Sequence, residues 1–146
     1  MRVRDVLEQK PSSLITVGPN TDLREVARLL VAHNIGGLAV VNGDGLPIGF
    51  VAERDLVRVV HDHPGAVQNI PVTAIMRAPP LCDVDDPLER VMWRMTRDRL
   101  RHLVVRDNGR FVGVISVGDI VKHRVEQLET EASVLRDYLA GQRAAR

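Results

Sequence analysis

Two stretches of the chain decide the fold: Gly49-Phe-Val-Ala-Glu-Arg-Asp55-Leu-Val57 and, 64 positions later, Gly113-Val-Ile-Ser-Val-Gly-Asp119-Ile-Val121. Each begins with a glycine inside an expected strand and reaches an aspartate where a helix is expected to begin. Upstream, Leu38-Ala-Val-Val41 matches Leu103-Val-Val-Arg106 at an offset of 65. The one-residue slip falls in a turn, where insertions are tolerated best. The chain therefore consists of two copies of one unit.

Each copy predicts the same order of elements. A helical turn and a short extended piece precede a helix, and two strands joined by a turn rich in Gly, Asn and Asp follow. A last helix begins near Asp55 in the first copy and near Asp119 in the second. The expected extended pieces and strands are 14–17, 38–41 and 48–52 in the first copy, and 81–84, 103–106 and 111–116 in the second.

This order predicts an α+β fold made of two β-α-β-β-α repeats. A three-stranded sheet in a unit of about 60 residues is marginal alone. We therefore expect the two units to bury their sheet faces against each other with pseudo-twofold symmetry. The expected boundaries are residues 1–66 for the first repeat, 67–125 for the second, and 126–146 for a C-terminal helical extension.

The internal helix of each repeat carries apolar residues at helical spacing, which predicts the face that it buries. These faces should attach the helices to the sheets. The expected buried residues are Leu23, Val26, Leu30 and Val31 in the first copy, and Leu88, Val91, Met92 and Met95 in the second.

The last helix of the second copy is longer than one repeat needs. From Val121 to Leu139 its apolar residues are spaced alternately by four and three, which is typical of a coiled-coil seam. Two interpretations follow. Either the helix packs back across its own domain, or it is a dimerisation or partner-docking helix.

Composition excludes several classes of protein. The 146 residues include 20 Lys and Arg against 19 Asp and Glu, a net charge of +1, whereas general nucleic-acid binders carry a strong basic excess. The four aromatic residues, Phe50, Trp93, Phe111 and Tyr138, are too few for a base-stacking platform. Cys82 is the only cysteine, so one chain forms neither an internal disulfide nor a thiolate metal cluster.

Targeting and catalytic patterns are also missing from the sequence. The N-terminus alternates charged and apolar residues, unlike a signal peptide, and no apolar stretch is long enough to span a bilayer. We therefore expect a cytoplasmic protein that does not bind membranes. The sequence contains no P-loop, nucleophile elbow or metal-ligand spacing, so we expect neither catalysis nor a metal site.

The repeated aspartates carry the most chemistry. A helix N-terminus offers free N–H groups and the positive end of a dipole, both suited to a phosphate. An aspartate at that place can accept hydrogen bonds from ribose hydroxyls, as in dinucleotide sites, and the Ser116 hydroxyl can donate to a phosphate oxygen. The alternative interpretation is that Asp55 and Asp119 only cap their helices.

With these repeats the chain resembles a tandem pair of cystathionine-β-synthase (CBS) domains, or Bateman module, over about residues 3–125. The resemblance implies non-catalytic regulatory sensors that bind adenosyl ligands between the repeats. AMP, ADP and ATP are common ligands, and S-adenosylmethionine or NAD-type ligands occur in some members. A stand-alone pair with a Glu-rich C-terminal helix resembles the bacterial signalling subgroup.

The resemblance also implies site residues. In the second copy Ser116 and Asp119 match the motif whose hydroxyl meets phosphate and whose aspartate holds ribose, and in the first copy Ala52 replaces the hydroxyl. We therefore expect one good nucleotide site and one weaker site. The good site comprises Thr16, Val17, Arg101, His102, Ser116 and Asp119, and the weaker one Gly37, Leu38, Asp55, Leu81 and Cys82.

The expected function is a cytoplasmic sensor that binds an adenine nucleotide (AMP, ADP, ATP or an NAD-type ligand) and signals through a homodimer to an unknown regulated protein. No catalytic cofactor and no direct contact with nucleic acid are expected. The alternative is a ligand-independent scaffold that acts through its C-terminal helix.

Overall fold

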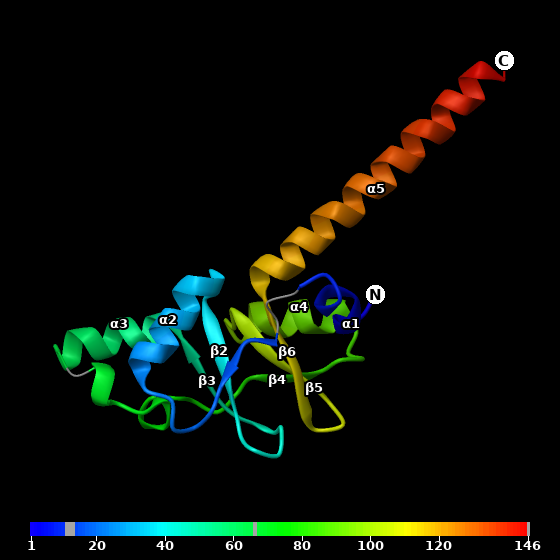
Figure 1. Cartoon of the computed structure of the whole chain (residues 1–146). Helices are drawn as coiled ribbons and strands as arrows, with labels where there is room; N and C mark the ends of the chain where they lie inside the picture. Colours follow the sequence, from blue (N-terminus) through cyan, green and yellow to red (C-terminus); the bar gives the residue numbers. More distant parts are fainter. Residues whose placement is uncertain (11–13, 66, 146) are drawn as a thin grey trace.

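The chain folds around two three-stranded sheets. The computed structural model describes residues 1–10, 14–65 and 67–145. Residue 66, the last residue of the expected first repeat, lies outside the described residues. In each sheet the first strand runs parallel to the second, which forms an antiparallel hairpin with the third. The strands are β1 (Thr16–Val17), β2 (Gly37–Val41) and β3 (Pro47–Ala52) in one sheet, and β4 (Leu81–Asp83), β5 (His102–Asp107) and β6 (Arg110–Ser116) in the other (Figure 1). The predicted α+β class and strand order are confirmed.

Helices follow the expected order. The α-helices are α1 (Val3–Leu7), α2 (Leu23–His33), α3 (Glu53–Asp62), α4 (Leu88–Arg97) and α5 (Val117–Ala144), and short 3-10 turns cover Val67–Asn69 and Val72–Ala74. The Asp22 carboxylate accepts a hydrogen bond from the Glu25 backbone N–H at 2.9 Å and caps α2. The helices α3 and α5 begin directly after the third strand of their sheets, which brings Asp55 and Asp119 to helix starts.

The buried helix faces match the predicted spacing except at their edges. Leu23, Val26 and Leu30 of α2 are buried, and so are Leu88, Val91 and Met95 of α4. The prediction was wrong for Val31, which is 82% exposed, and for Met92, which is 36% exposed. Both follow a buried residue by one position, a rotation of about 100° around the helix, so they lie outside the stripe that meets the sheet.

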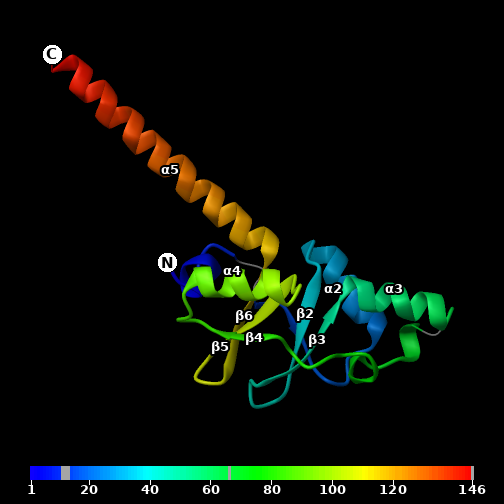
Figure 2. The same cartoon turned by 180° about the vertical axis from the view of Figure 1, so that it is seen from behind.

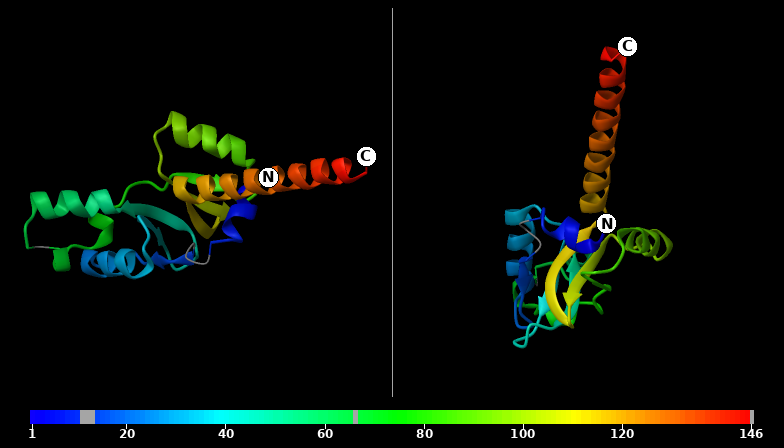
Figure 3. Two further views of the ribbon diagram at one scale, coloured as in Figure 1. Left: turned by 90° about the horizontal axis from the view of Figure 1, so that it is seen from above. Right: turned by 90° about the vertical axis from the view of Figure 1, so that its right-hand side faces the viewer.

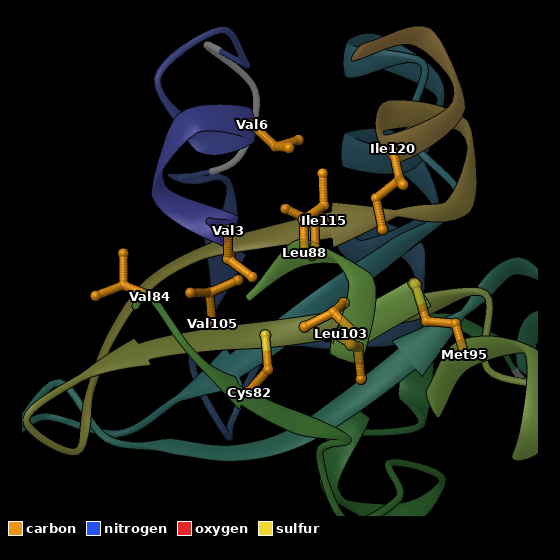
Figure 4. Packing of buried hydrophobic residues seen from close by; sticks show 11 residues of the cluster. Val3, Val6, Cys82, Val84, Leu88, Met95, Leu103, Val105, Ile115 and Ile120 are labelled. Carbon is orange, nitrogen blue, oxygen red and sulfur yellow. The ribbon is translucent and has the colours of Figure 1, made fainter. Parts of the chain in front are cut away.

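Three apolar clusters hold the repeats together. Each repeat has its own cluster between its sheet and its helix, and Figure 4 shows the cluster of the second repeat. A third cluster joins Ala39 and Phe50 of one sheet to Val104 and Val114 of the other. The two sheets therefore bury their faces against each other, as the marginal size of one unit predicts.

The leading turn of each repeat packs on the other repeat. Val3 and Val6 of α1 lie in the cluster of the second repeat, toward Ile115 and its neighbours (Figure 4), and the Val3 N–H donates to the Asp86 carbonyl at 3.1 Å. In the same way Val72 is buried in the cluster of the first repeat. The bridges Arg2–Pro87 and Asp22–Pro71 are equivalent under the pseudo-twofold relation. The helical turn that opens each copy in the sequence therefore belongs to the hydrophobic core of the other copy.

The helix α5 leaves the body and projects from it as one straight rod (Figures 1 and 2). At a rise of 1.5 Å per residue its 28 residues span about 42 Å. Ile120 is its buried residue, and every residue from 128 to 145 is exposed. The interpretation that this helix packs back across its own domain is therefore wrong beyond its first turns. The helix is continuous across the expected boundary between residues 125 and 126.

Candidate functional site

A pocket of about 320 Å³ lies between the two repeats, beside the start of α5. Residues from both repeats line it, because the segment before β1 and the loop before β2 come from the first copy, while β5, β6 and α5 come from the second. We call it the Asp119 pocket. Its lining includes Val6, Gln9, Lys10, Ile15, Asn34, Ile35, Gly36, Gly37, His102, Val114, Ser116, Asp119, Lys122 and His123.

Ser116 and Asp119 form a reciprocal cap at the start of α5. The Ser116 N–H donates to Asp119 Oδ2 at 2.7 Å, and the Asp119 N–H donates to Ser116 Oγ at 3.2 Å. The interpretation that Asp119 caps its helix is therefore confirmed. Asp119 Oδ1 has no hydrogen-bond partner within the part of the chain that the structure describes. The carboxylate thus caps the helix through Oδ2, the oxygen that Lys10 also contacts.

Lys10 is one of the residues of this pocket that sequence reasoning missed. Its Nζ lies 2.6 Å from Asp119 Oδ2 and donates to the Val114 carbonyl at 3.0 Å. The side chains of Lys10 and Asp119 are 16% and 24% exposed. Lys10 and Asp119 are 109 positions apart in the sequence, so only the tertiary structure brings them together. No local sequence pattern identifies this lysine.

His102 separates the Asp119 pocket from a second pocket and lines both. Its ring packs against Phe50, with centroids 5.3 Å apart and planes at 41°. Burial lowers the pKa of His102 below its ordinary value, and the nearby Lys10 charge lowers it further. The neutral imidazole is therefore the form that this wall of the pocket holds at neutral pH.

The second pocket has a volume of about 640 Å³ and lies on the Asp55 side of the repeats. We call it the Asp55 pocket, since it adjoins the start of α3. Four of its lining residues are arginines: Arg54, Arg77, Arg99 and Arg101. The other lining residues include Gly36, Phe50, Ala52, Glu53, Val57, Ala78, Pro80, Leu100 and His102.

Asp55 itself is buried and already paired. It is 7% exposed, its Oδ2 accepts from the Ala52 N–H at 2.8 Å, and its Oδ1 pairs with the Arg77 guanidinium. The missing hydroxyl at Ala52 thus removes one half of the reciprocal cap that Ser116 and Asp119 form. Asp55 is not among the residues that line this pocket, whereas its partner Arg77 is.

The structure brings together part of the expected good site. His102, Ser116 and Asp119 line one pocket, as expected. Thr16 and Val17 form β1, and their neighbour Ile15 provides the apolar wall in their place. Arg101 lines the Asp55 pocket instead.

The residues of the expected weaker site are dispersed. Gly37 lines the Asp119 pocket, where a Cβ would meet the Phe50 ring. Leu38 and Cys82 have side chains buried in the cores of the two repeats, and neither residue lines the Asp119 pocket or the Asp55 pocket. Leu81 is half-buried at the contact between the sheets, and its carbonyl accepts a hydrogen bond from Arg94.

Burial also governs the lone thiol. Cys82 is 3% exposed, and desolvation, followed by the charge of Asp86, raises the pKa of its thiol to about 12. The thiol is therefore a core group at neutral pH and not a nucleophile.

Two further features bear on the kind of site. Across residues 1–10, 14–65 and 67–145, no three His, Cys, Asp or Glu side chains gather as metal ligands. Within the same ranges, no helix combines the length and the apolar character that crossing a bilayer requires.

The fold and the pockets define a tandem pair of CBS domains. The sequence matches the CBS domain family twice, over residues 3–62 and 72–126. The chain therefore belongs to the CBS domain family. Its two β-α-β-β-α repeats and the pockets between them agree with that assignment.

Solved structures of other CBS proteins share the fold. The CBS-domain containing protein ATU1752 from Agrobacterium tumefaciens is 38% identical, with a TM-score of 0.76 over 85% of this chain and 99% of that one. The CBS domain protein PAE2072 from Pyrobaculum aerophilum, complexed with AMP, is 28% identical, with a TM-score of 0.74 over 90% of this chain and 99% of that one.

A curated relative is longer. The uncharacterized protein MJ1225 of Methanocaldococcus jannaschii is 30% identical over 120 residues, which are 82% of this chain and 41% of that protein. The chain thus spans less than half of that relative.

Proposed function

We propose that this protein is a non-catalytic regulatory module that binds an adenine nucleotide in the Asp119 pocket. The observation that carries the proposal is the group formed by Lys10, Ser116 and Asp119, which places a carboxylate, a hydroxyl and an ammonium together at a helix N-terminus between the repeats. The AMP complex of PAE2072 supports this choice of ligand.

The pocket offers a partner for each part of a nucleotide. The free Oδ1 of Asp119 accepts from ribose hydroxyls. Lys10 and Lys122, with the N-terminal N–H groups of α5, provide positive charge for the phosphate. Ile15 and Ile35 provide apolar surface for the base, next to the expected Thr16 and Val17.

AMP, ADP, ATP and NAD-type ligands all contain the ribose and phosphate that this group would bind. The Asp55 pocket serves as a second and weaker site, since the adjoining Asp55 carboxylate is held by Arg77 and does not line the pocket. In this proposal the protein is a cytoplasmic homodimer, and ligand binding changes how it acts on a regulated protein. The helix α5 suits this role because it begins with the pocket residues and ends far from the body (Figure 1).

A ligand-independent scaffold is the second candidate. The observation that favours it is the exposure of α5 from residue 128 to 145. In that case α5 would be the functional element and the pockets would have no physiological ligand.

Thermal unfolding with AMP, ADP, ATP, NAD, NADH and S-adenosylmethionine tests the proposal. A ligand at 100 times its Kd adds about 2.7 kcal/mol of stability, which raises the melting temperature by roughly 2–8 °C for a chain of this size. The matched variants are Asp119→Ala and Asp55→Ala, which remove equivalent carboxylates of the two repeats. We expect Asp119→Ala to abolish the shift and Asp55→Ala to retain most of it. No shift with any ligand favours the scaffold, and equal loss in both variants contradicts the assignment to the Asp119 pocket.

A further inference from the structure

An apolar stripe runs along the projecting part of α5. It consists of Val121, Val125, Leu128, Ala132, Leu135 and Leu139, and we call it the α5 seam. Its five large residues are 47–58% exposed. A continuous stripe of this kind over five helical turns is the pattern that a second helix covers in a coiled coil. The seam therefore needs a partner.

That partner is not the body of the same chain. Ile120, His123 and Gln127 recur at intervals of three and four and form the side of α5 that meets the body: Ile120 is buried, His123 contacts Met1, and Gln127 lines a pocket with Met1 and Leu88. At 100° per residue the centre of the seam lies about 125° around the helix from this side. Figure 3 shows α5 projecting clear of both repeats.

The seam residues favour a two-stranded coil. With Val121 at a d position of the heptad, Leu128 and Leu135 also take d positions. The a positions are Val125, Ala132 and Leu139, of which Val125 is β-branched. A β-branched residue at a with leucine at d favours two parallel strands.

The charges beside the seam select the partner and its direction. Arg124 and Glu131 occupy g positions, while Glu129 and Arg136 occupy e positions. In a parallel, in-register pair each g residue faces the e residue five positions later on the other helix. Glu131 then faces Arg136 of the second copy. Arg124, whose guanidinium donates to Gln127 Oε1 at 2.8 Å beside Met1, turns from that contact to face Glu129. In an antiparallel pair with the seam aligned, Glu129 faces Glu129 and Glu131 faces Glu131, so like charges repel.

We propose that α5 binds α5 of a second copy of this chain as a parallel, in-register, two-stranded coiled coil over residues 121–139. The helix is complementary to itself in both apolar pattern and charge, so an identical chain is the occupant that the observations favour. The pair gives the homodimer of the proposed function its interface, and its signalling role rests on that proposal. Because Asp119 and Lys122 lie in the first turns of α5, the Asp119 pocket of each copy would adjoin the base of the coil.

Cross-linking tests the direction and register. The full chain with Leu135→Cys should form a disulfide-linked dimer rapidly under mild oxidation, since residue 135 faces its own copy in a parallel pair. Val134→Cys is the matched control, one position off the seam and 63% exposed. The buried Cys82 contributes little background. Cross-linking of Leu135→Cys no faster than that of Val134→Cys overturns the proposal.

Sedimentation equilibrium supplies a second measurement. The native chain should have twice the monomer mass of 16.2 kDa. Leu135→Glu should return it to the monomer, while Val134→Glu should leave the dimer intact. Arg124→Glu should weaken dimerisation about tenfold, or about 1.4 kcal/mol, and adding Glu129→Arg should restore it. A monomeric native chain, or a dimer insensitive to Leu135→Glu, overturns the pairing.

Neither measurement uses a nucleotide, so the two proposals fail separately. Thermal shifts without cross-linking refute the coiled coil alone. Cross-linking without thermal shifts refutes nucleotide sensing alone.

Discussion

Replacing Lys10 by methionine should weaken the binding of AMP but not that of adenosine, two ligands that differ only in a phosphate. In the structure the Lys10 ammonium lies 2.6 Å from Asp119 Oδ2. When AMP binds, we expect this charge to turn toward the phosphate and the carboxylate to turn toward the ribose. Lys10→Met should therefore weaken AMP binding, while adenosine, which has no phosphate, should bind as well as before or better, since no ammonium competes for Asp119.

The magnitudes follow from burial. A hydrogen bond to a charged group contributes about 1.5–3 kcal/mol, so loss of a Lys10–phosphate contact should weaken AMP binding roughly 10- to 150-fold. The ligand-free protein should lose about 1–2 kcal/mol of unfolding free energy, because the ion pair is 16% and 24% exposed. Arg28→Met is the control: Arg28 and Glu25 are also 2.6 Å apart but 62% and 43% exposed, so solvent screens this pair and its loss should change the unfolding free energy far less.

Isothermal titration calorimetry with AMP and adenosine, together with urea unfolding of each variant, measures both effects. An Asp119→Ala variant should lose affinity for both ligands, because the ribose is common to them. Equal AMP affinity in native and Lys10→Met proteins would refute the phosphate role of Lys10. Equal stability would refute the claim that its ion pair contributes to the fold.

Three further predictions concern His102, Gly37 and Cys82. Burial lowers the pKa of His102 in the folded protein. As pH falls below about 6.5, this imidazole therefore becomes protonated in the unfolded chain before it does so in the folded protein, which destabilises the fold. Urea unfolding from pH 7 to 5.5 should show the unfolding free energy decline by at most about 1.4 kcal/mol per pH unit from this group, and the decline should be smaller in His102→Gln. Gly37→Ala should lower the unfolding free energy by about 1–3 kcal/mol in thermal or urea unfolding, because its Cβ meets the Phe50 ring, and an unchanged stability would show that the ring moves aside freely. The Cys82 thiol, with a pKa of about 12, should react with iodoacetamide at pH 8 only after unfolding, so rapid labelling of the native protein would contradict its burial.

Much of the fold could be predicted because its signals are local. Alternating apolar residues, the turns at 42–45 and 107–109, and helix-start residues such as Asp22 each determine structure within a few positions. The repeat then implied the pseudo-twofold packing. The errors at Val31 and Met92 arose where an apolar residue beside a stripe was counted as part of it.

The sequence by itself determined the two repeats, the helix starts at Asp55 and Asp119, and the seam of α5. Tertiary structure alone decided the partners of the two carboxylates, which are Lys10 and Arg77, at separations of 109 and 22 positions. It also decided that Arg101 lines the Asp55 pocket. The physical reason is that periodicity specifies which face of an element is buried, whereas an ion pair requires two side chains to meet across elements whose placement depends on the packing of the whole core.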